Sequence, residues 1–174
     1  MKIRKLTAKD AKIYRKLRME ALKQFPNAFL MTLEEEEKRI RPIKYVSEQL
    51  KDPNCYTIGA FLNEQLIGVV TLQKEKTLKI KHKGNVLSMI VAPKCQGMGI
   101  GKMLLQSIIK IAKENKLEQL YLSVVSDNFI AKKLYASVGF HPYGLERNAL
   151  KWNNKYWDEE HMVLFLSSKQ VTHT

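Results

Sequence analysis

Cysteine is scarce in this sequence, and long apolar runs are missing. The chain of 174 residues has only two cysteines, Cys55 and Cys95, too few for the disulfide framework on which many small secreted domains depend. No apolar run approaches the ~18 residues that a membrane-spanning helix needs. The first ten residues, MKIRKLTAKD, lack the apolar core of a secretory signal. We therefore expect a cytoplasmic protein with an ordinary hydrophobic core.

Acidic residues are also in the minority. Thirty lysines and arginines against 17 aspartates and glutamates give a formal net charge of +13, which favours anionic partners such as phosphorylated small molecules or nucleic acids. The basic residues are nevertheless scattered, and the densest run, KEKTLKIKHK (74–83), alternates like a strand with one wet face. No RNA-binding aromatic motif, zinc-finger spacing or helix-turn-helix pattern accompanies the charge. A basic nucleic-acid-binding module is therefore a disfavoured alternative.

The apolar residues repeat with periods that change between about 2 and about 3.6 along the chain, which indicates mixed α/β structure. The predicted order is strand, two helices, three strands, helix, strand, helix and two strands. Strands are expected at 2–7, 56–63, 66–75, 85–92, 119–125, 141–151 and 155–166, and helices from Thr7 to about residue 23, from Thr32, at 99–115 and up to 138. We expect a single domain over residues 1–167 and a flexible polar tail at 168–174.

Only the segments around the last two long helices can form parallel crossovers, so the early strands must pair as antiparallel hairpins. The sequence therefore predicts a mixed, mostly antiparallel sheet with helices on both faces. The strand at 85–92 is the most apolar and is expected at its centre. Capping signals stand at the helix ends. They are Thr7 with Asp10, Thr32, and Ser126 or Asp127 at N-termini, and Gly139 at a C-terminus.

Three of the eight glycines stand together in VAPKCQGMGIGK (91–102), at positions 97, 99 and 101. The stretch follows the central strand and opens the clearest helix. Its unpaired backbone N–H groups and the positive end of the helix dipole would therefore face an anion. Glycine lets an anion approach without meeting a Cβ atom, and Lys102 adds a positive charge. The arrangement favours a phosphate site, although a glycine-rich turn by itself can also be a plain linker.

Three phosphate-binding patterns compete for this stretch. A P-loop needs GxxxxGK[ST], but here the spacing differs and residue 103 is methionine. A dinucleotide fold needs GxGxxG inside an N-terminal βαβ unit, whereas the glycines give GxGxG and no such unit surrounds them. The third pattern, Q-x-x-G-x-G, is filled by Gln96, Gly99 and Gly101.

A second segment, DNFIAKKLYASVGF (127–140), follows the strand at 119–125. It fills the pattern N-x-x-A-x-x-L-Y-x-x-x-G-F from Asn128 to Phe140 without a gap. Together the two segments resemble the pyrophosphate-binding motif and the following motif of the GNAT superfamily of acyl-CoA-dependent N-acetyltransferases. The two motifs stand in the family's order, and the predicted elements match its fold, the N-terminal helices by topology alone.

This resemblance implies a GNAT-like fold in which the central strand opens at a bulge and splays from its parallel neighbour, with the pantetheine arm of acetyl-CoA in the gap. Backbone groups of 89–91 would hold the pantetheine amides and 96–102 would cradle the pyrophosphate. Asn128 would hydrogen-bond the arm, with helix capping as the alternative. The implied cofactor-binding residues are Met89, Ile90, Val91, Gln96, Gly97, Met98, Gly99, Ile100, Gly101, Lys102 and Asn128.

The implied reaction is direct attack of a neutral amine on the thioester carbonyl of acetyl-CoA in a ternary complex, with no metal. Tyr135 would be the catalytic acid near the sulfur, because a phenol with a pKa near ~10 can protonate a leaving thiolate. The alternative is an aromatic that only packs on a buried helix face. The backbone N–H of Val91 or Ile90 would polarise the carbonyl.

The base that takes the amine proton is not identified by the resemblance. Some family members that modify protein N-termini carry a glutamate five residues before the asparagine, where this chain has Ser123. The candidates are the cluster Glu34–Glu37, which helix-dipole compensation also explains, Glu146, and His141 acting through water. A CoA-binding regulatory domain without catalysis is thus the second alternative. The expected partners are acetyl-CoA and an amine acceptor, with a homodimer allowed and no membrane.

Overall fold

The structure is a computed structural model that describes residues 1–166. The predicted tail at 168–174 lies outside the described residues. The described part holds seven strands and five α-helices. They are β1 (Lys2–Lys5), α1 (Ala11–Gln24), α2 (Leu33–Glu37), α3 (Pro42–Lys51), β2 (Cys55–Leu62), β3 (Gln65–Lys74), β4 (Lys83–Val91), α4 (Ile100–Glu114), β5 (Gln119–Val125), α5 (Phe129–Ala136), β6 (His141–Trp152) and β7 (Lys155–Phe165). No helix among residues 1–166 is long and apolar enough to cross a membrane.

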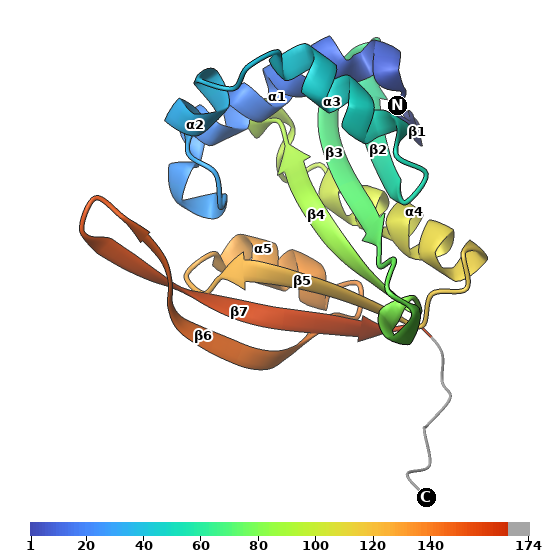
Figure 1. The fold of residues 1–174 in the computed structure, drawn as a ribbon, viewed down its shortest axis with the longest axis vertical. Helices are drawn as coiled ribbons and strands as arrows, with labels where there is room; N and C mark the ends of the chain where they lie inside the picture. Colours follow the sequence, from blue (N-terminus) through green and yellow to red (C-terminus); the bar gives the residue numbers. More distant parts are fainter. Residues whose placement is uncertain (167–174) are drawn as a thin grey trace, which may run out of the picture.

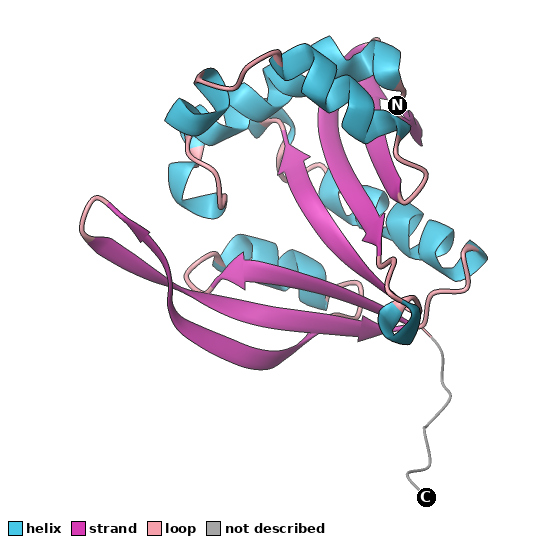
Figure 2. Cartoon of the chain, in the orientation of Figure 1, coloured by secondary structure: helices cyan, strands magenta, loops and turns pink. Residues whose placement is uncertain are grey.

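The seven strands form one sheet in the order β1-β2-β3-β4-β5-β7-β6 (Figures 1 and 2). The pair β4–β5 is parallel, and the other neighbouring pairs are antiparallel. This confirms the predicted mixed, mostly antiparallel sheet, and β4 stands at its centre as expected. The last strand inserts between β5 and β6, so the α5 connection crosses over one strand.

Helices cover both faces of the sheet, as predicted, and each face has its own core. Helices α1 and α3 pack on one face, in a cluster with residues of β2, β3 and β4 such as Phe61, Val69 and Ile90. Helix α4 packs on the other face. Its buried side chains recur at spacings of three and four residues, which places them on one face of the helix. They are Ile100, Leu104, Leu105, Ile108 and Ala112.

The N-terminal region has three α-helices before β2 where two were predicted. The prediction of a helix capped by Thr32 is confirmed, but α2 ends after five residues at Glu37 and a separate helix, α3, begins at Pro42. Proline has no backbone N–H and fits the first turn of a helix. Arg41 before it adopts a left-handed backbone (φ +50°), which ends any continuous helix there.

The tight turns of two β-hairpins consist of residues with left-handed backbone. Asn63 and Glu64 (φ +48° and +65°) form a two-residue hairpin turn, so β3 begins at Gln65, one residue before the predicted start of that strand. Asn153 and Asn154 do the same between β6 and β7. Helix α5 ends at Ala136, two residues before the predicted end.

The predicted capping pair at the start of the chain is present, and it predicts an acid-sensitive contribution to stability. The Asp10 carboxylate accepts the Thr7 N–H at 2.7 Å and two Arg4 guanidinium N–H bonds at 2.8 Å each. These bonds, that of Arg4 foremost, lower the pKa of Asp10 to about 2. An unfolded aspartate has a pKa of about 3.9. The contribution to stability is therefore complete above that value and lost as the pH falls through about 2.

We expect the free energy of unfolding to fall by about 1 kcal/mol from this group as the pH drops from about 4 to about 2. The value is modest because Arg4 is 35% exposed and water screens the pair. Denaturant unfolding of wild type and Asp10→Asn across this range measures the effect. If the free energy of unfolding of Asp10→Asn fell as steeply with acid as that of wild type, the assignment to Asp10 would be wrong.

Candidate functional site

The centre of the sheet is irregular where β4 leaves its neighbours. Thr71 pairs with Leu87 and Val69 with Ile90, so two steps along β3 match three along β4. The extra residue lies at Ser88, whose backbone is left-handed (φ +52°). Strand β4 therefore carries the bulge that the resemblance implied.

Beyond the start of β4, β4 and β5 separate. Their parallel pairing runs only from Lys83 and Gln119 to Asn85 and Tyr121, and the strands then diverge (Figure 1). The edge of β4 that faces β5 therefore presents backbone groups without a strand partner. These groups suit a ligand that has amides of its own.

The backbone N–H of Val91 points toward this gap. The Ala92 N–H donates to the Ile67 carbonyl of β3 at 2.7 Å. Since backbone groups alternate sides along an antiparallel strand, the N–H of Ile90 also points to β3 and that of Val91 points away from it. Of the two expected carbonyl-polarising donors, Val91 is the one with the right direction.

A cleft of about 790 Å³ occupies the gap. Its lining comes from α1, the segment 28–31, the connection between β3 and β4 (Glu75 and Ile80), β4, β5, α5, β6 and β7. Met89 lines the cleft, whereas the side chain of Ile90 is buried in the α1/α3 core and that of Val91 packs against the α4 core. In this stretch of β4 the backbone, more than the side chains, is available to a ligand.

The glycine stretch forms the turn between β4 and α4. Gly97 and Gly99 have left-handed backbones (φ +79° and +75°), and a Cβ atom added at either would meet nothing within 4 Å. Gly99 is the N-cap of α4 and has no side chain to satisfy the first N–H groups of the helix. Open space over unsatisfied N–H groups suits a phosphate.

The neighbouring residues of this turn differ in their accessibility. Gln96, Met98 and Lys102 are exposed, whereas Ile100 is buried. The Gln96 side chain donates to the Val91 carbonyl at 3.5 Å. Gly101 has a packing reason of its own, because a Cβ there would lie 2.8 Å from Leu134 of α5. The turn thus offers backbone donors, with Lys102 as the charged side chain beside them.

Asn128 caps helix α5. Its Oδ1 accepts the Ala131 N–H at 3.1 Å, so the prediction that Ser126 or Asp127 caps this helix is wrong. The reason is that the helix begins at Phe129, which makes Asn128 the residue directly before it. The cap uses the carbonyl oxygen of the side chain and leaves its Nδ2 group to donate to a ligand.

Tyr135 lies on α5 and lines the same cleft as Met89. It is 8% exposed, and its ring packs edge-on against Phe140 at a centroid distance of 6.1 Å. Burial raises the pKa of Tyr135 to about 12. The phenol therefore stays protonated, as a hydrogen-bond donor, throughout the neutral and moderately alkaline range.

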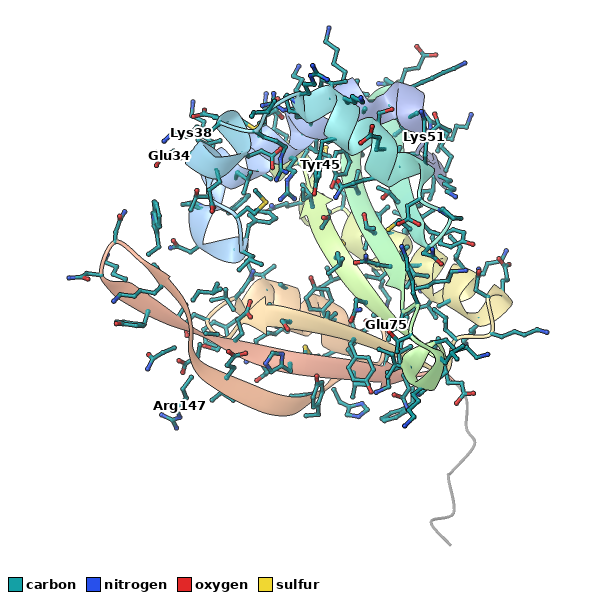
Figure 3. The ribbon with its side chains drawn as sticks, in the orientation of Figure 1. Glu34, Lys38, Tyr45, Lys51, Glu75 and Arg147 are labelled. Atoms are coloured by element: carbon teal, nitrogen blue, oxygen red, sulfur yellow. The ribbon has the colours of Figure 1, made fainter. Side chains whose placement is uncertain are left out.

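The glutamate cluster on α2 serves the fold and does not line the cleft. Glu35 closes the capping box with Thr32. Glu34 pairs with Lys38, and Figure 3 shows the two together on the outer side of α2. Glu36 is 2% exposed and lies 3.4 Å from each of Arg18 and Arg39, which ties α2 to α1.

The other two candidate bases have different surroundings. His141 is exposed and stacks on Phe165 at 5.7 Å, away from the cleft. The Oε2 atom of Glu146, on β6, lies 3.1 Å from the Nε2 atom of His161, within hydrogen-bonding distance. The second ring nitrogen of His161, Nδ1, lies 2.7 Å from the Oγ of Ser123.

Two residues of β7, Glu159 and His161, were not predicted as site residues from the sequence. They stand on one side of the strand, because side chains alternate, and Met162 and Leu164 on its other side pack in the α4 core. Glu159 lines the cleft. Burial raises the pKa of Glu159 above its usual value, Glu146 adds to the rise, and His161 lowers it. Alternation within 155–166 was the signal available, but it does not say which strands lie beside β7.

Comparison with known proteins agrees with this geometry. The family model of the acetyltransferase (GNAT) domain matches residues 3–161. The chain belongs to the GNAT acetyltransferase family. Among the described residues of this family member, no group of three or more His, Cys, Asp or Glu side chains could hold a metal ion.

Two curated relatives are named as N-acetyltransferases. The N-alpha-acetyltransferase RimI of Mycobacterium tuberculosis is 31% identical over 102 residues, which are 58% of this chain and 61% of that protein. The [ribosomal protein bS18]-alanine N-acetyltransferase of Haemophilus influenzae is 30% identical over 86 residues, 49% of this chain and 55% of that protein. The chain thus spans less than two thirds of these relatives' lengths.

Solved structures share the GNAT fold over nearly the whole chain. A proposed acetyltransferase of Salmonella typhimurium, solved with its cofactor acetyl-CoA, has a TM-score of 0.84 at 17% identity and covers 100% of this chain and 98% of that one. A probable acetyltransferase of Staphylococcus epidermidis has a TM-score of 0.78 at 24% identity, with 95% and 99% covered. These likenesses concern the fold.

Proposed function

We propose that this protein is an acetyl-CoA-dependent N-acetyltransferase that acetylates a primary amine of a small molecule or a peptide. The observation that carries the proposal is the unpaired edge of β4 beyond the Ser88 bulge, which continues into the open turn at Gly97 and Gly99. Tyr135 opens into the same cleft. Family membership supports the reaction type, and the two relatives named above make a peptide amine a reasonable acceptor.

The residues present fit acetyl-CoA. The turn with Gly97 and Gly99 has room for a pyrophosphate over the N-terminus of α4, and Lys102 adds a charge. Backbone groups of Met89 and Val91 would hold the pantetheine arm, with Asn128 donating from Nδ2. Acetyl-CoA supplies the thioester that an amine attacks.

Two groups of this chain would act on the reacting atoms. The Val91 N–H, directed into the gap, would polarise the thioester carbonyl and stabilise the charge that develops on its oxygen. The Tyr135 hydroxyl would donate to the sulfur as the thiolate leaves. Direct attack within a ternary complex requires that the amine lose its charge before it attacks.

We expect CoA and acetyl-CoA to bind more weakly as salt rises from ~0.1 M to ~1 M, because the Debye length falls from ~10 Å to ~3 Å and the pyrophosphate contact is electrostatic. Titration calorimetry measures this. Lys102→Ala should weaken binding modestly, since the main donors are backbone groups. The matched control is Lys110→Ala on the same helix, which removes an exposed lysine 4.0 Å from Glu114.

A screen of amines with acetyl-CoA, reading release of free thiol, tests the reaction itself. Absence of CoA binding at millimolar ligand would remove the whole proposal. Binding without thiol release from any amine or peptide would leave a CoA-binding domain without catalysis.

A further inference from the structure

Three side chains form a hydrogen-bonded chain across three neighbouring strands. Ser123 of β5 lies 2.7 Å from Nδ1 of His161 on β7, and Nε2 of His161 lies 3.1 Å from Oε2 of Glu146 on β6. Ser123 and His161 are direct partners across the β5–β7 pair. Of the three, Ser123 lines the cleft, together with Tyr135. The chain therefore leads from the cleft to the exposed Glu146.

The hydrogen bonds define a consistent tautomer for His161. An ionised carboxylate only accepts hydrogen bonds, so the Nε2 atom facing Glu146 carries a proton and donates it. The Nδ1 atom is then the acceptor, and the Ser123 hydroxyl donates to it. This leaves the lone pairs of the serine oxygen free to accept an N–H from a ligand in the cleft.

The charged and titratable groups nearest His161 lie on β6 and β7. Glu146 and Tyr143 lie on β6, the latter with a ring centroid 6.0 Å from the imidazole. Glu159 lies on β7 two positions before His161. Arg18 of α1 lines the cleft but is paired with Glu36. His161 stands at the end of the chain, where the lone pair of its Nδ1 atom faces the Ser123 hydroxyl at 2.7 Å and can accept the proton of that group.

We propose that Ser123 contacts the attacking amine and passes its proton to His161, which Glu146 holds in place. The proposal rests on the function proposed above. As the amine nitrogen bonds to the thioester carbon, its proton goes to the Ser123 oxygen while the serine proton goes to Nδ1 of His161. The C–S bond breaks, the sulfur takes the proton of Tyr135, and the amide and free CoA thiol leave. Solvent then removes a proton from His161 and returns one to Tyr135.

Ser123 lines the cleft, whereas His161 is not among the residues that line it. Here the accepting group is an imidazole one strand away, and the serine hydroxyl bridges the distance. Ser123 is thus the residue that touches substrate, and Glu146 is a positioning residue.

The test uses the full chain, acetyl-CoA and the amine that wild type acetylates fastest. We expect His161→Gln to lower kcat about 100-fold near neutral pH, the lower end of the range for a catalytic base, with the acetyl-CoA dissociation constant unchanged. The deficit should shrink at high pH, because the amine then arrives neutral and hydroxide can take its proton. Ser123→Ala should show the same change of pH profile. His82→Gln, in the turn before β4, is the matched control and should behave like wild type.

A rescue experiment separates proton transfer from structure. Adding Ser123→Glu to His161→Gln places a carboxylate at the cleft and should recover at least about tenfold in kcat. If His161→Gln lowered kcat equally at every pH and Ser123→Glu did not rescue it, His161 would have a structural role and the proposal would be wrong. A near-normal kcat in His161→Gln would also overturn the proposal. The function proposed above would still stand in both cases, because wild type would still acetylate the amine. If wild type itself neither binds CoA nor acetylates an amine, the proposed function fails instead.

Discussion

Replacing Tyr135 by phenylalanine is expected to lower kcat by about 100- to 10,000-fold, the range for a positioned acid, and to leave acetyl-CoA affinity nearly unchanged. The ring keeps its edge contact with Phe140, and only the hydroxyl is lost. With a pKa raised to about 12 by burial, the phenol is a weaker acid than a thiol of about 8.5. We therefore expect it to donate a hydrogen bond to the sulfur first, and its proton only as the C–S bond breaks.

The measurement is kcat together with the dissociation constant for acetyl-CoA, followed by a single-turnover experiment. The matched control is Tyr56→Phe, which removes a phenol that donates to Asn115 at 3.0 Å, away from the cleft. Unchanged single-turnover chemistry in Tyr135→Phe would make Tyr135 a packing residue.

Because its pKa is about 12, Tyr135 should cause no loss of activity below about pH 11, and a steep alkaline loss of activity near pH 9 in wild type must come from another group.

Gly99→Val is expected to weaken acetyl-CoA binding by at least about 100-fold, which corresponds to about 2.7 kcal/mol. Two effects act together. The branched side chain would fill the open space over the helix N-terminus, and valine strongly disfavours the backbone at φ +75°, at a cost of about 1–2 kcal/mol. Loss of two charge-assisted hydrogen bonds alone accounts for an effect of this size.

Calorimetry on Gly99→Val, with thermal unfolding as the check on folding, measures this effect. Gly101→Val is the comparison, and the structure changes what is expected of it. Its side chain would press on Leu134 and Met89, so stability should fall as well as affinity. Wild-type acetyl-CoA affinity in Gly99→Val would show that the turn is only a linker.

The fold was largely predictable because its signals are local. The stripe of apolar residues along α4 and the alternation in the strands depend on near neighbours in the chain, and they gave the right elements in nearly the right places. The error at the start of α5 arose because three local signals competed. Ser126, Asp127 and Asn128 can all cap a helix, and which one does so depends on where the chain leaves β5.

The sequence by itself determined the two motifs, the position of the glycine turn before a helix, Tyr135 on the following helix and Asn128 directly before that helix. The tertiary structure decided the splay of β4 from β5, the direction of the Val91 N–H and the partners of His161. Ser123 and His161 are 38 positions apart, and His161 and Glu146 are 15 apart. The pairing register alone brings them together, and since a slip of one residue moves every side chain to the opposite face, no local pattern can specify that meeting.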